Sequence, residues 1–571
     1  MKPIITVDIE TYSPQDIKTV GAYRYAQDPE FQILLFGFAI GDEDVPNVMD
    51  LTDLPDPGAV LRMQPWLLDD RYTKRAHNAA FEWWCLSEVM GLSWEERTEW
   101  LSQWECSMVH ALYCGLPAQL GALGAALKQP EDVLKMKEGK ALIKYFCVPC
   151  KPTKVNGGRT RNLPQHDPDK WRLFCKYNGM DVIAERANDR KLAPWPVPEE
   201  IMQQWREDVE MNARGVAVDM ELVEGALACS ALITEEQTAE CKALTGLANP
   251  GSRAQLLGWL HNRGVEVPGL TKEDVSKALA GDLPSDVRRV LELRQQLGKT
   301  SNTKYETIAA SAGPDHRVRG TLQFYGASRT GRWAGRLLQV QNLPRTYLDH
   351  QAEWRSIVKL HDPEALALLT DNVSDTLSQL IRTALVPGKS CTFVDADFSA
   401  IEARLIAWLA GEEWVLDVFR TTGKTTQPRA GVIFRKEVAG GSPFPFLTLQ
   451  LPSGRKLFYA DPGTTPDDRI TYKEWDNGGW REAETYGGKL TENLTQAVGR
   501  DCLAFALDNL RRAGYRVVFH VHDEVIIELP DTQNADAALQ DVMRIMSIVP
   551  PWAEGLPLNA AGWHGDFFTK D

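Results

Sequence analysis

The sequence lacks long hydrophobic runs and shows no targeting segment near Met1. The chain passes at once into Ile4-Ile5-Thr6-Val7, and no apolar stretch approaches the roughly 20 residues that span a bilayer. We therefore expect no membrane segment and a cytoplasmic location.

A disulfide framework is also absent. The 10 cysteines are scattered without regular spacing, so we expect reduced, mostly buried thiols. Cys147 and Cys150, with Cys175 further on, could supply half of a zinc site. A second CxxC motif or a matching His pair is missing, so zinc binding is the less favoured interpretation.

The chain has no overall excess of positive charge. A net charge of −15 argues against a protein that coats nucleic acid with its whole surface. One local basic stretch exists, because residues 316–348 contain no Asp or Glu but include Arg317, Arg319, Arg329, Arg332, Arg336 and Arg345. A solvated surface loop is the simplest interpretation of such a run. Its four glycines, at 320, 326, 331 and 335, favour backbone that lies close to phosphates.

What is present indicates several domains, since 571 residues exceed what one core usually organises. Strands expected at 4–10 and 33–40 and a helix at about 80–90 indicate an α/β domain. A helix over 171–191 ends at the proline-rich segment 194–198, where we place a boundary. Residues 199–310 look mainly helical. Strands are expected again at 392–398 and in a hairpin, 515–521 with 525–529.

A first set of acidic residues is spread over three segments of the amino-terminal part. Asp8 and Glu10 lie two apart on an expected strand and so share one face, where they could bind a divalent cation together. Glu82 ends the segment that begins at Ala76. Tyr177 and Asp181 fall on one face of an expected helix. The order and spacing carry more information than any one pair.

These three segments resemble the motifs of DnaQ-like 3′-to-5′ exonucleases. The resemblance implies that Asp8, Glu10, Glu82 and Asp181 hold two metal ions for phosphodiester hydrolysis, and that Tyr177 orients the attacking water. The second motif usually ends in Asp, so Glu82 is a departure from the pattern. The alternative is an inactive scaffold that carries surface acids.

A second acidic set lies in the carboxyl-terminal part. Residues 392–404 read as an apolar strand that ends at Asp397 and leads into a helix. Residues 519–528 read as strand, polar turn and strand, with Asp523 in the turn. A carboxylate at a strand end is well fixed for metal binding.

These two segments resemble motifs A and C of family A DNA polymerases, the group that includes bacterial DNA polymerase I and many phage replicases. Residues 330–332 and 341–344 look like the primer-template segment of the family, and Gln496 like a palm residue. The resemblance implies that Asp397 and Asp523 hold two Mg²⁺ ions, with Mn²⁺ as an alternative, for nucleotidyl transfer. It also implies substrate contacts: Glu402 as a gate against the ribose 2′-hydroxyl, and primer-template contacts from Arg332, Gln341, Gln496 and His522. For His522 taken alone, a structural turn histidine is the simpler interpretation.

One element of the family is not found. Between Gly411 and Glu524 no helix has the cation and aromatic spacing that binds the incoming triphosphate. Asp397 and Asp523 are 126 positions apart, several dozen fewer than the family would need. A deletion of most of the fingers between about Lys424 and Pro443 is the simplest account.

The expected architecture is an α/β RNase H-like exonuclease domain (1–195), then a right-hand α+β polymerase domain. The latter would have a helical thumb region (196–320) and an antiparallel-sheet palm (321–571), with reduced fingers at about 411–480. The expected function is template-directed DNA synthesis with proofreading in DNA replication. Expected partners are primer-template DNA, deoxynucleoside triphosphates and replisome proteins. We expect a monomer without membrane contact, in the host cytoplasm if the gene belongs to a phage.

Two other interpretations remain open. The first is a synthesis-deficient relative that works as a 3′-to-5′ exonuclease, and the second is a non-catalytic scaffold that binds primer-template DNA. A single-subunit RNA polymerase would share the palm with its two metal-binding carboxylates, but Glu402 and the exonuclease motifs count against this interpretation.

Overall fold

The computed structural model describes residues 2–134, 136, 138–297, 303–370, 372–412, 431–439, 442–467 and 469–569. Contacts within the chain group them into two compact units. The first unit contains residues up to Gly215, Arg319–Gln339 and Ser390–His564, and the second contains Val216–Val318, Val340–Lys389 and the end of the chain from Gly565. The functional boundaries expected near residues 195 and 320 stay a prediction.

The first unit begins with a five-stranded sheet in the order β3-β2-β1-β4-β5. Strand β1 pairs antiparallel with β2 and parallel with β4, so the sheet is mixed. The apolar runs in β1 and β2 fit central strands that are covered on both faces. The strand bounds are β1 Ile4–Tyr12, β2 Gln32–Ile40, β3 Asn47–Asp50, β4 Thr73–Ala76 and β5 Trp104–Cys106.

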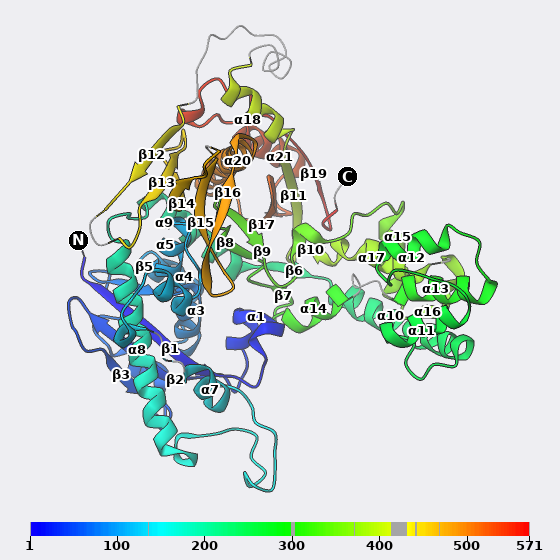
Figure 1. The fold of residues 1–571 in the computed structure, drawn as a ribbon, viewed down its shortest axis with the longest axis horizontal. Coiled ribbons are helices and arrows are strands. Elements are labelled where there is room, and N and C mark those ends of the chain that lie inside the picture. The colour runs from blue at the N-terminus through cyan, green and yellow to red at the C-terminus, as the bar shows by residue number, and fades with distance from the viewer. Residues whose placement is uncertain are drawn as a thin grey trace. The chain divides into compact units, whose positions relative to one another are not determined.

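Helices pack against this sheet, and α8 (Pro168–Leu192) is the longest of them (Figure 1). It contacts β1, β2 and β3 and continues towards Trp195. Asp167 caps its first turn through the backbone N–H of Lys170, and Pro168 at its start fits a position that has no N–H to donate. The other helices of this region are α1 Ile17–Ala26, α2 Pro57–Arg62, α3 Ala80–Val89, α4 Trp94–Leu101, α5 Ser107–Tyr113, α6 Leu120–Ala126, α7 Gly139–Phe146 and α9 Glu199–Arg214.

A second sheet of the first unit has the order β17-β18-β11-β19. Strand β18 pairs antiparallel with β11 and with β17. Helices α18, α20 and α21 contribute to the apolar core beside it. The bounds are β11 Cys391–Phe398, β17 Val517–Val521, β18 Glu524–Pro530, β19 Ala560–Gly565, α18 Ile401–Ala410, α20 Gly487–Arg512 and α21 Ala535–Met546.

A third sheet, antiparallel and in the order β12-β13-β14-β15-β16, fills much of the region expected to hold reduced fingers. Residues 413–430, 440 and 441, which include part of the segment in which we placed the deletion, lie outside the described residues. Trp195 packs edge-on against Phe446 of this sheet. The bounds are β12 Ile433–Glu437, β13 Phe446–Gln450, β14 Lys456–Thr464, β15 Ile470–Asp476 and β16 Gly479–Thr485.

The second unit is mainly helical, with a small sheet in the order β10-β6-β7. One of its apolar clusters is built around Trp259, Leu260 and Leu291. The bounds are β6 Val216–Val218, β7 Arg317–Val318, β10 Leu385–Val386, α10 Met220–Thr245, α11 Arg253–Asn262, α12 Lys272–Leu279, α13 Ser285–Leu297, α14 Thr303–Ser311, α15 Gln351–Val358, α16 Pro363–Leu369 and α17 Val373–Leu380.

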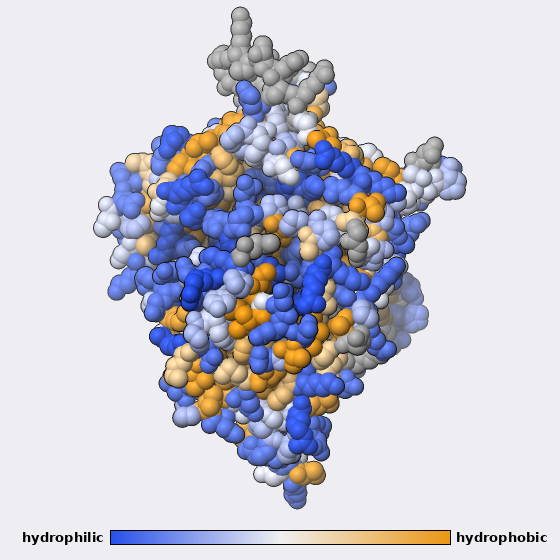
Figure 2. All heavy atoms as spheres, turned by 90° about the vertical axis from the view of Figure 1, so that its left-hand side faces the viewer, coloured by the Kyte–Doolittle hydropathy of each residue, from blue (hydrophilic) through white to orange (hydrophobic). Residues whose placement is uncertain are grey.

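Hydrophobic residues on the face drawn in Figure 2 occur in small groups among hydrophilic ones. Of the helices that the structure describes, none combines the length and the apolar content needed to cross a bilayer.

Candidate active sites

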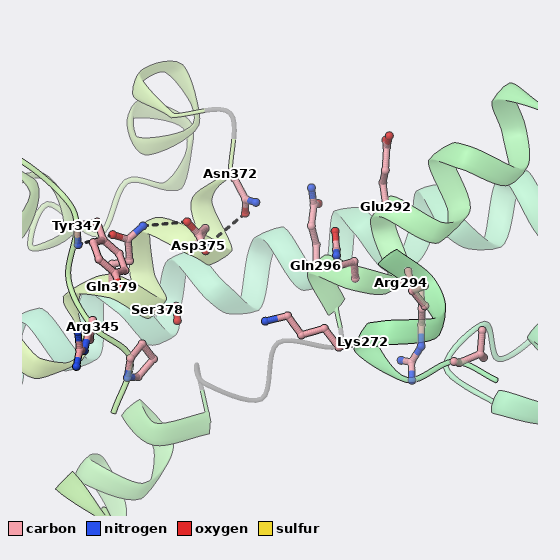
Figure 3. Close-up of a pocket in the computed structure, with 14 residues that line it drawn as sticks. Lys272, Glu292, Arg294, Gln296, Arg345, Tyr347, Asn372, Asp375, Ser378 and Gln379 are labelled. Atoms are coloured by element: carbon pink, nitrogen blue, oxygen red, sulfur yellow. Dashed lines mark hydrogen bonds between the residues drawn. The ribbon is translucent and has the colours of Figure 1, made fainter. Parts of the chain in front are cut away.

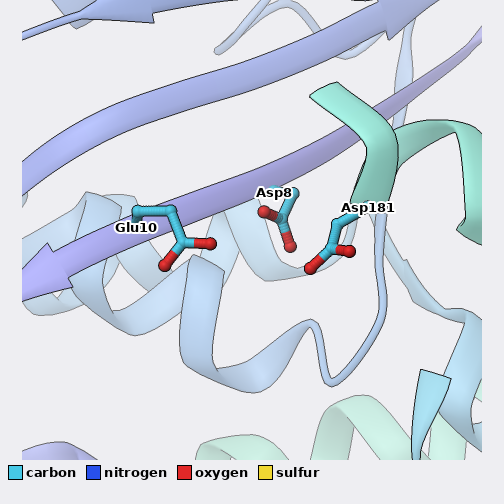
Figure 4. Close-up of side chains that lie close together, drawn as sticks. All are labelled: Asp8, Glu10 and Asp181. Carbon is cyan, nitrogen blue, oxygen red and sulfur yellow. The ribbon is translucent and has the colours of Figure 1, made fainter. Parts of the chain in front are cut away.

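Asp8, Glu10 and Asp181 form a group of carboxylates in the first unit. Each offers one oxygen, and these oxygens all lie within 4.8 Å of one another. Asp8 and Glu10 come from one face of β1, and Asp181 comes from α8 above the sheet (Figure 4). The sheet and the helix thus bring together residues more than 170 positions apart.

Asn178 holds Asp8 in place within this group. Its amide donates to the Asp8 carboxylate at 2.7 Å and to the Asp8 backbone carbonyl at 3.2 Å. Gly37 lies opposite Asp8 on β2, and a Cβ atom there would come within 2.5 Å of the Asn178 side chain. A glycine at this position is what allows Asn178 to reach Asp8.

Tyr177 and Glu82 are buried beside the group. Tyr177 is inaccessible to solvent, and burial together with the charge of Asp181 raises the pKa of its hydroxyl. Burial and the charges of Asp8 and Glu10 raise the pKa of Glu82 well above its usual range. Glu82 is not part of the close group of three. It is near enough for the charges of Asp8 and Glu10 to shift its pKa.

Glu185 is a further buried acid that the sequence analysis missed. It follows Asp181 by one helical turn on α8, is 2% exposed, and its Oε1 has no hydrogen-bond partner. Burial and the charge of Asp8 raise its pKa to about 8. The spacing Tyr177, Asp181, Glu185 repeats every four residues, and that period was a usable signal.

This donor set fits a divalent metal ion. Carboxylate oxygens bind Mg²⁺, Mn²⁺ or Ca²⁺ at about 2.0 to 2.6 Å, so two oxygens on one ion lie at most about 5 Å apart. The group of three meets that condition. The buried, unpaired oxygens of Glu82 and Glu185 add negative charge that only protons or a cation can offset.

The second acidic set meets at the edge of β11 and β18. Asp397 pairs in register with Glu524, and Asp523 lies in the turn between β17 and β18. The backbone N–H of Phe398 donates to the Asp523 carbonyl at 3.4 Å, which places the turn against the end of β11. His522 takes a positive φ of 56° in this turn. The end of β11 that carries Asp397 therefore lies next to the turn that carries Asp523.

Of the other predicted contact residues, Arg332 lies close to this turn, and Glu402 lies in the helix that follows β11. A guanidinium nitrogen of Arg332, on β9 (Arg332–Gly335), lies 3.1 Å from Nδ1 of His522. Glu402 lies exposed in the first turn of α18, where the helix dipole favours an acid. The β8–β9 hairpin, β8 being Leu322–Ala327, thus reaches the turn that carries Asp523.

A buried ion pair anchors the helix that carries Gln496. Arg455 contacts Asp501 of α20 at 2.7 Å, and both side chains are at most 5% exposed. Gln496 itself is half-buried and donates to Glu492 at 3.3 Å. Gln341 belongs to the second unit.

The arginines of residues 316–348 have different surroundings. Arg319 donates to the Ala213 carbonyl at 2.6 Å, and Arg329 pairs with Glu474 at 2.8 Å. Arg336 bonds to Gln323. These three cations bond to protein groups, so phosphate binding stays a prediction for Arg317, Arg332 and Arg345.

The second unit contains a cavity of about 810 Å³. Lys272 extends into it from α12, and Arg345 lies on its opposite side (Figure 3). Asp375 hydrogen-bonds to Asn372 and Gln379 on the same wall. Because its lining mixes both signs of charge, the cavity favours no single class of ligand.

The cysteines offer no zinc site among the described residues. Cys147 directs its thiol to Glu10 at 3.9 Å, whereas Cys150 donates to the Arg159 carbonyl at 3.4 Å. All 10 thiols are free, as the sequence analysis expected.

No family model matches the chain. The DNA polymerase of Bacillus phage SP02 is 39% identical to it over 661 residues, covering 99% of this chain and 100% of the relative. That span exceeds the 571 residues present here, so the relative contains residues without a counterpart in this chain. The fold is similar to that of the POL domain of Pol1 from M. smegmatis, solved in complex with DNA primer-template and dNTP, with a TM-score of 0.55 and 15% identity over 99% of this chain and 95% of that one. Sequence and fold together show that the chain belongs to the DNA polymerases.

Proposed function

We propose that this chain extends DNA primers on a template and removes nucleotides from primer 3′ ends. The observation that carries the proposal is the 39% identity to a phage DNA polymerase over the whole of both chains. Two separate carboxylate sets on two separate sheets support the division into synthesis and hydrolysis.

The proposed arrangement follows the family. The α/β part with the sheet β3-β2-β1-β4-β5 serves as an RNase H-like exonuclease domain, and the sheet β17-β18-β11-β19 serves as the palm. The helical second unit serves as the thumb region. The sheet β12–β16 occupies the position of the reduced fingers in the chain.

For hydrolysis, Asp8, Glu10 and Asp181 would hold Mg²⁺ or Mn²⁺, with Glu82 nearby. When bound, the metal supplies an activated water and stabilises the leaving oxygen. Asn178 keeps the Asp8 carboxylate oriented, and Tyr177 keeps its proton because its pKa is raised. A protonated phenol can donate a hydrogen bond to a water or a phosphate oxygen.

For synthesis, Asp397 and Asp523 would hold the metals that act on the primer 3′-hydroxyl and on pyrophosphate. Arg332 and His522 form one hydrogen-bonded pair next to Asp523, which suits contact with the primer end. Glu402 would exclude a ribose 2′-hydroxyl. Gln341 and Gln496 would contact the primer-template.

A second candidate is an exonuclease that has lost efficient synthesis. It is favoured by the 661-residue span of the alignment against 571 residues here, and by the absence from the sequence of a triphosphate-binding helix motif. Cations that grip the triphosphate would then be lacking, while both carboxylate sets remain.

A labelled primer-template tests the proposal. Parent, Asp8→Ala and Asp397→Ala chains are incubated with Mg²⁺, with and without deoxynucleotides, and the primer length is followed. We expect extension that Asp397→Ala abolishes and shortening that Asp8→Ala abolishes. The size of each loss should be about 10³-fold or more, since metal ligands are removed.

Other outcomes separate the candidates. Shortening that only Asp8→Ala removes, with no extension in any sample, supports the second candidate. Binding of primer-template without either activity would contradict both and favour a non-catalytic scaffold.

A further inference from the structure

Residues 139–166 form a basic segment whose charge is opposite to that of the chain as a whole. It contains no Asp or Glu but six cations: Lys140, Lys144, Lys151, Lys154, Arg159 and Arg161. In a chain with a net charge of −15, such a stretch stands out as a surface for an anionic partner. Figure 1 shows the chain between α7 and α8 extending beyond the helices that hold it.

The base of the basic segment packs next to the Asp8, Glu10 and Asp181 group. Leu142 and Phe146 share an apolar cluster with Tyr12 and Tyr177. The Cys147 thiol lies 3.9 Å from Glu10 Oε2. Residues at the base of the segment thus contact the residues that line the carboxylates.

Arg161 connects the far end of the segment to β1. Its guanidinium lies 3.6 Å from the ring centroid of Tyr12, two residues after Glu10. One of its nitrogens donates to Gln32 at 2.7 Å, and its buried Nε has no hydrogen-bond partner. A cation stacked on an aromatic ring can still contact a phosphate.

The tip of the segment is held in one shape by its own hydrogen bonds. Asn156 donates to the carbonyls of Lys151 and Arg159 at 2.9 and 3.2 Å and accepts from Thr153 N–H at 2.8 Å. Val155 is 99% exposed at this tip, although an apolar side chain gains nothing from water. Exposed cations beside an exposed apolar side chain suit a strand with charged phosphates and apolar base faces.

We propose that the basic segment 139–166 binds single-stranded DNA and leads its 3′ end to Asp8, Glu10 and Asp181. The carboxylates Glu10 and Asp181 are 8% and 3% exposed, so a paired duplex end has little access and a flexible single strand is the better fit. The proposal rests on the proposed hydrolytic function for the direction of the strand, but binding itself does not depend on hydrolysis.

Binding is measured with the full chain in the Asp8→Ala background and in EDTA, so that the DNA stays intact. The probe is a fluorescently labelled single-stranded oligothymidylate, followed by anisotropy over a salt series. The test variant is Lys151→Gln with Lys154→Gln. The control, Arg512→Gln with Arg544→Gln, removes the same charge at exposed positions 70% and 66% accessible on α20 and α21.

The test variant should bind about 10-fold more weakly, and its log-log salt dependence should be shallower by about 1.4, as expected for two lost phosphate contacts on a single strand. Val155→Asp should weaken binding as well, while the control should match the background. Equal melting temperatures check that all variants are folded.

Several results would overturn the proposal. They are an unchanged affinity and salt slope in both test variants, no binding of the single strand by the Asp8→Ala chain, or an equal loss of affinity for a blunt duplex. Weaker binding in the test variants, in a parent chain that does not shorten DNA, would keep the surface and remove the hydrolytic function. If the parent chain shortens DNA but the test variants bind the single strand as well as the control, the hydrolytic function stands and the proposed binding surface is wrong.

Discussion

At the residue scale, the main feature of the site near β1 is that several carboxylates, most of them buried, lie close together. Asp8, Glu10 and Asp181 form the close group, while Glu82 and Glu185 lie around it with raised pKa values. A motif search identifies four of these acids. Glu185 lies outside the motifs, and its four-residue spacing after Asp181 on α8 was the one sequence signal for it.

Glu185→Gln should lower the rate of 3′-end hydrolysis by about 10- to 100-fold, the usual cost of removing a group that supports metal ligands. The side chain keeps its size, so single-strand binding in EDTA should not change. The required Mg²⁺ concentration should rise, which a purely structural role would not cause. Asp169→Asn, exposed on the same helix, serves as the control, and a rate equal to that of this control would contradict the role.

His110 should make stability depend on pH. Burial alone would lower its pKa, but the hydrogen bond with Asp189 at 3.0 Å outweighs burial and raises the pKa to about 10. A raised histidine pKa stabilises the folded state fully below about pH 6.5, and this stabilisation is lost as the pH rises towards 10.

Denaturant unfolding of the parent and His110→Gln chains at pH 7, 8 and 9 tests this direction of the pH dependence. The parent's advantage in free energy of unfolding should shrink by about 1.4 kcal/mol per pH unit. A difference that is constant or grows with pH would mean that His110 is neutral in the folded chain.

At the element scale, α7 and α8 approach so closely that only glycine fits at one point. A Cβ atom at Gly139 would come within 2.1 Å of the Tyr177 ring. Gly139→Ala should therefore displace Tyr177, destabilise the fold by about 1 to 3 kcal/mol and slow hydrolysis. Primer extension should be less affected, because Asp397 lies on another sheet and Asp523 lies in a turn of that sheet.

Gly258→Ala is the matched control, since Gly258 in α11 has open space around its Cβ position. Alanine there should stabilise the helix by about 0.5 to 1 kcal/mol. Thermal melting and the hydrolysis rate of both variants provide the measurement. If Gly139→Ala and Gly258→Ala had the same melting temperature and the same hydrolysis rate, the close packing at Gly139 would matter neither for stability nor for hydrolysis.

Elements with a clear period were predictable from the sequence. The strand expected at 392–398 is β11 Cys391–Phe398, and the helix expected at 171–191 is α8 Pro168–Leu192. The sheet β12–β16 was not anticipated, because the family resemblance assigned its residues to reduced fingers. Its strands pair in sequence order as successive antiparallel hairpins, so strand and turn patterns between them were a usable local signal that the resemblance overrode.

The candidate site was predictable as a list of residues but not as an arrangement. Asp8, Glu10, Glu82 and Asp181 were expected together, and the close group contains all of them except Glu82. The roles of Asn178 and Gly37 follow only from the contact between α8 and β2. The arginines 319 and 329 looked like phosphate ligands, yet they bond to protein groups. The sequence shows where the arginines are, but not which groups of the folded protein they bond to.

At the scale of the whole molecule, the span of the alignment with the phage SP02 enzyme raises the question of nucleotide binding. If this chain lacks the cations that grip the triphosphate, each lost charge-assisted hydrogen bond costs about 1.5 to 3 kcal/mol. Half-maximal extension should then need about 100-fold more deoxynucleotide than the SP02 enzyme needs. Equal requirements in a primer-extension titration would show that other residues bind the triphosphate.

The claim on which the hydrolytic account depends is that Asp8, Glu10 and Asp181 hold a divalent metal ion. Mn²⁺ binding to the full chain, counted by electron paramagnetic resonance, tests it directly. The parent should bind at least one more Mn²⁺ per chain than Asp8→Ala or Asp181→Asn, while the control Asp169→Asn should match the parent. Equal stoichiometry and affinity in the parent and both site variants would contradict the claim.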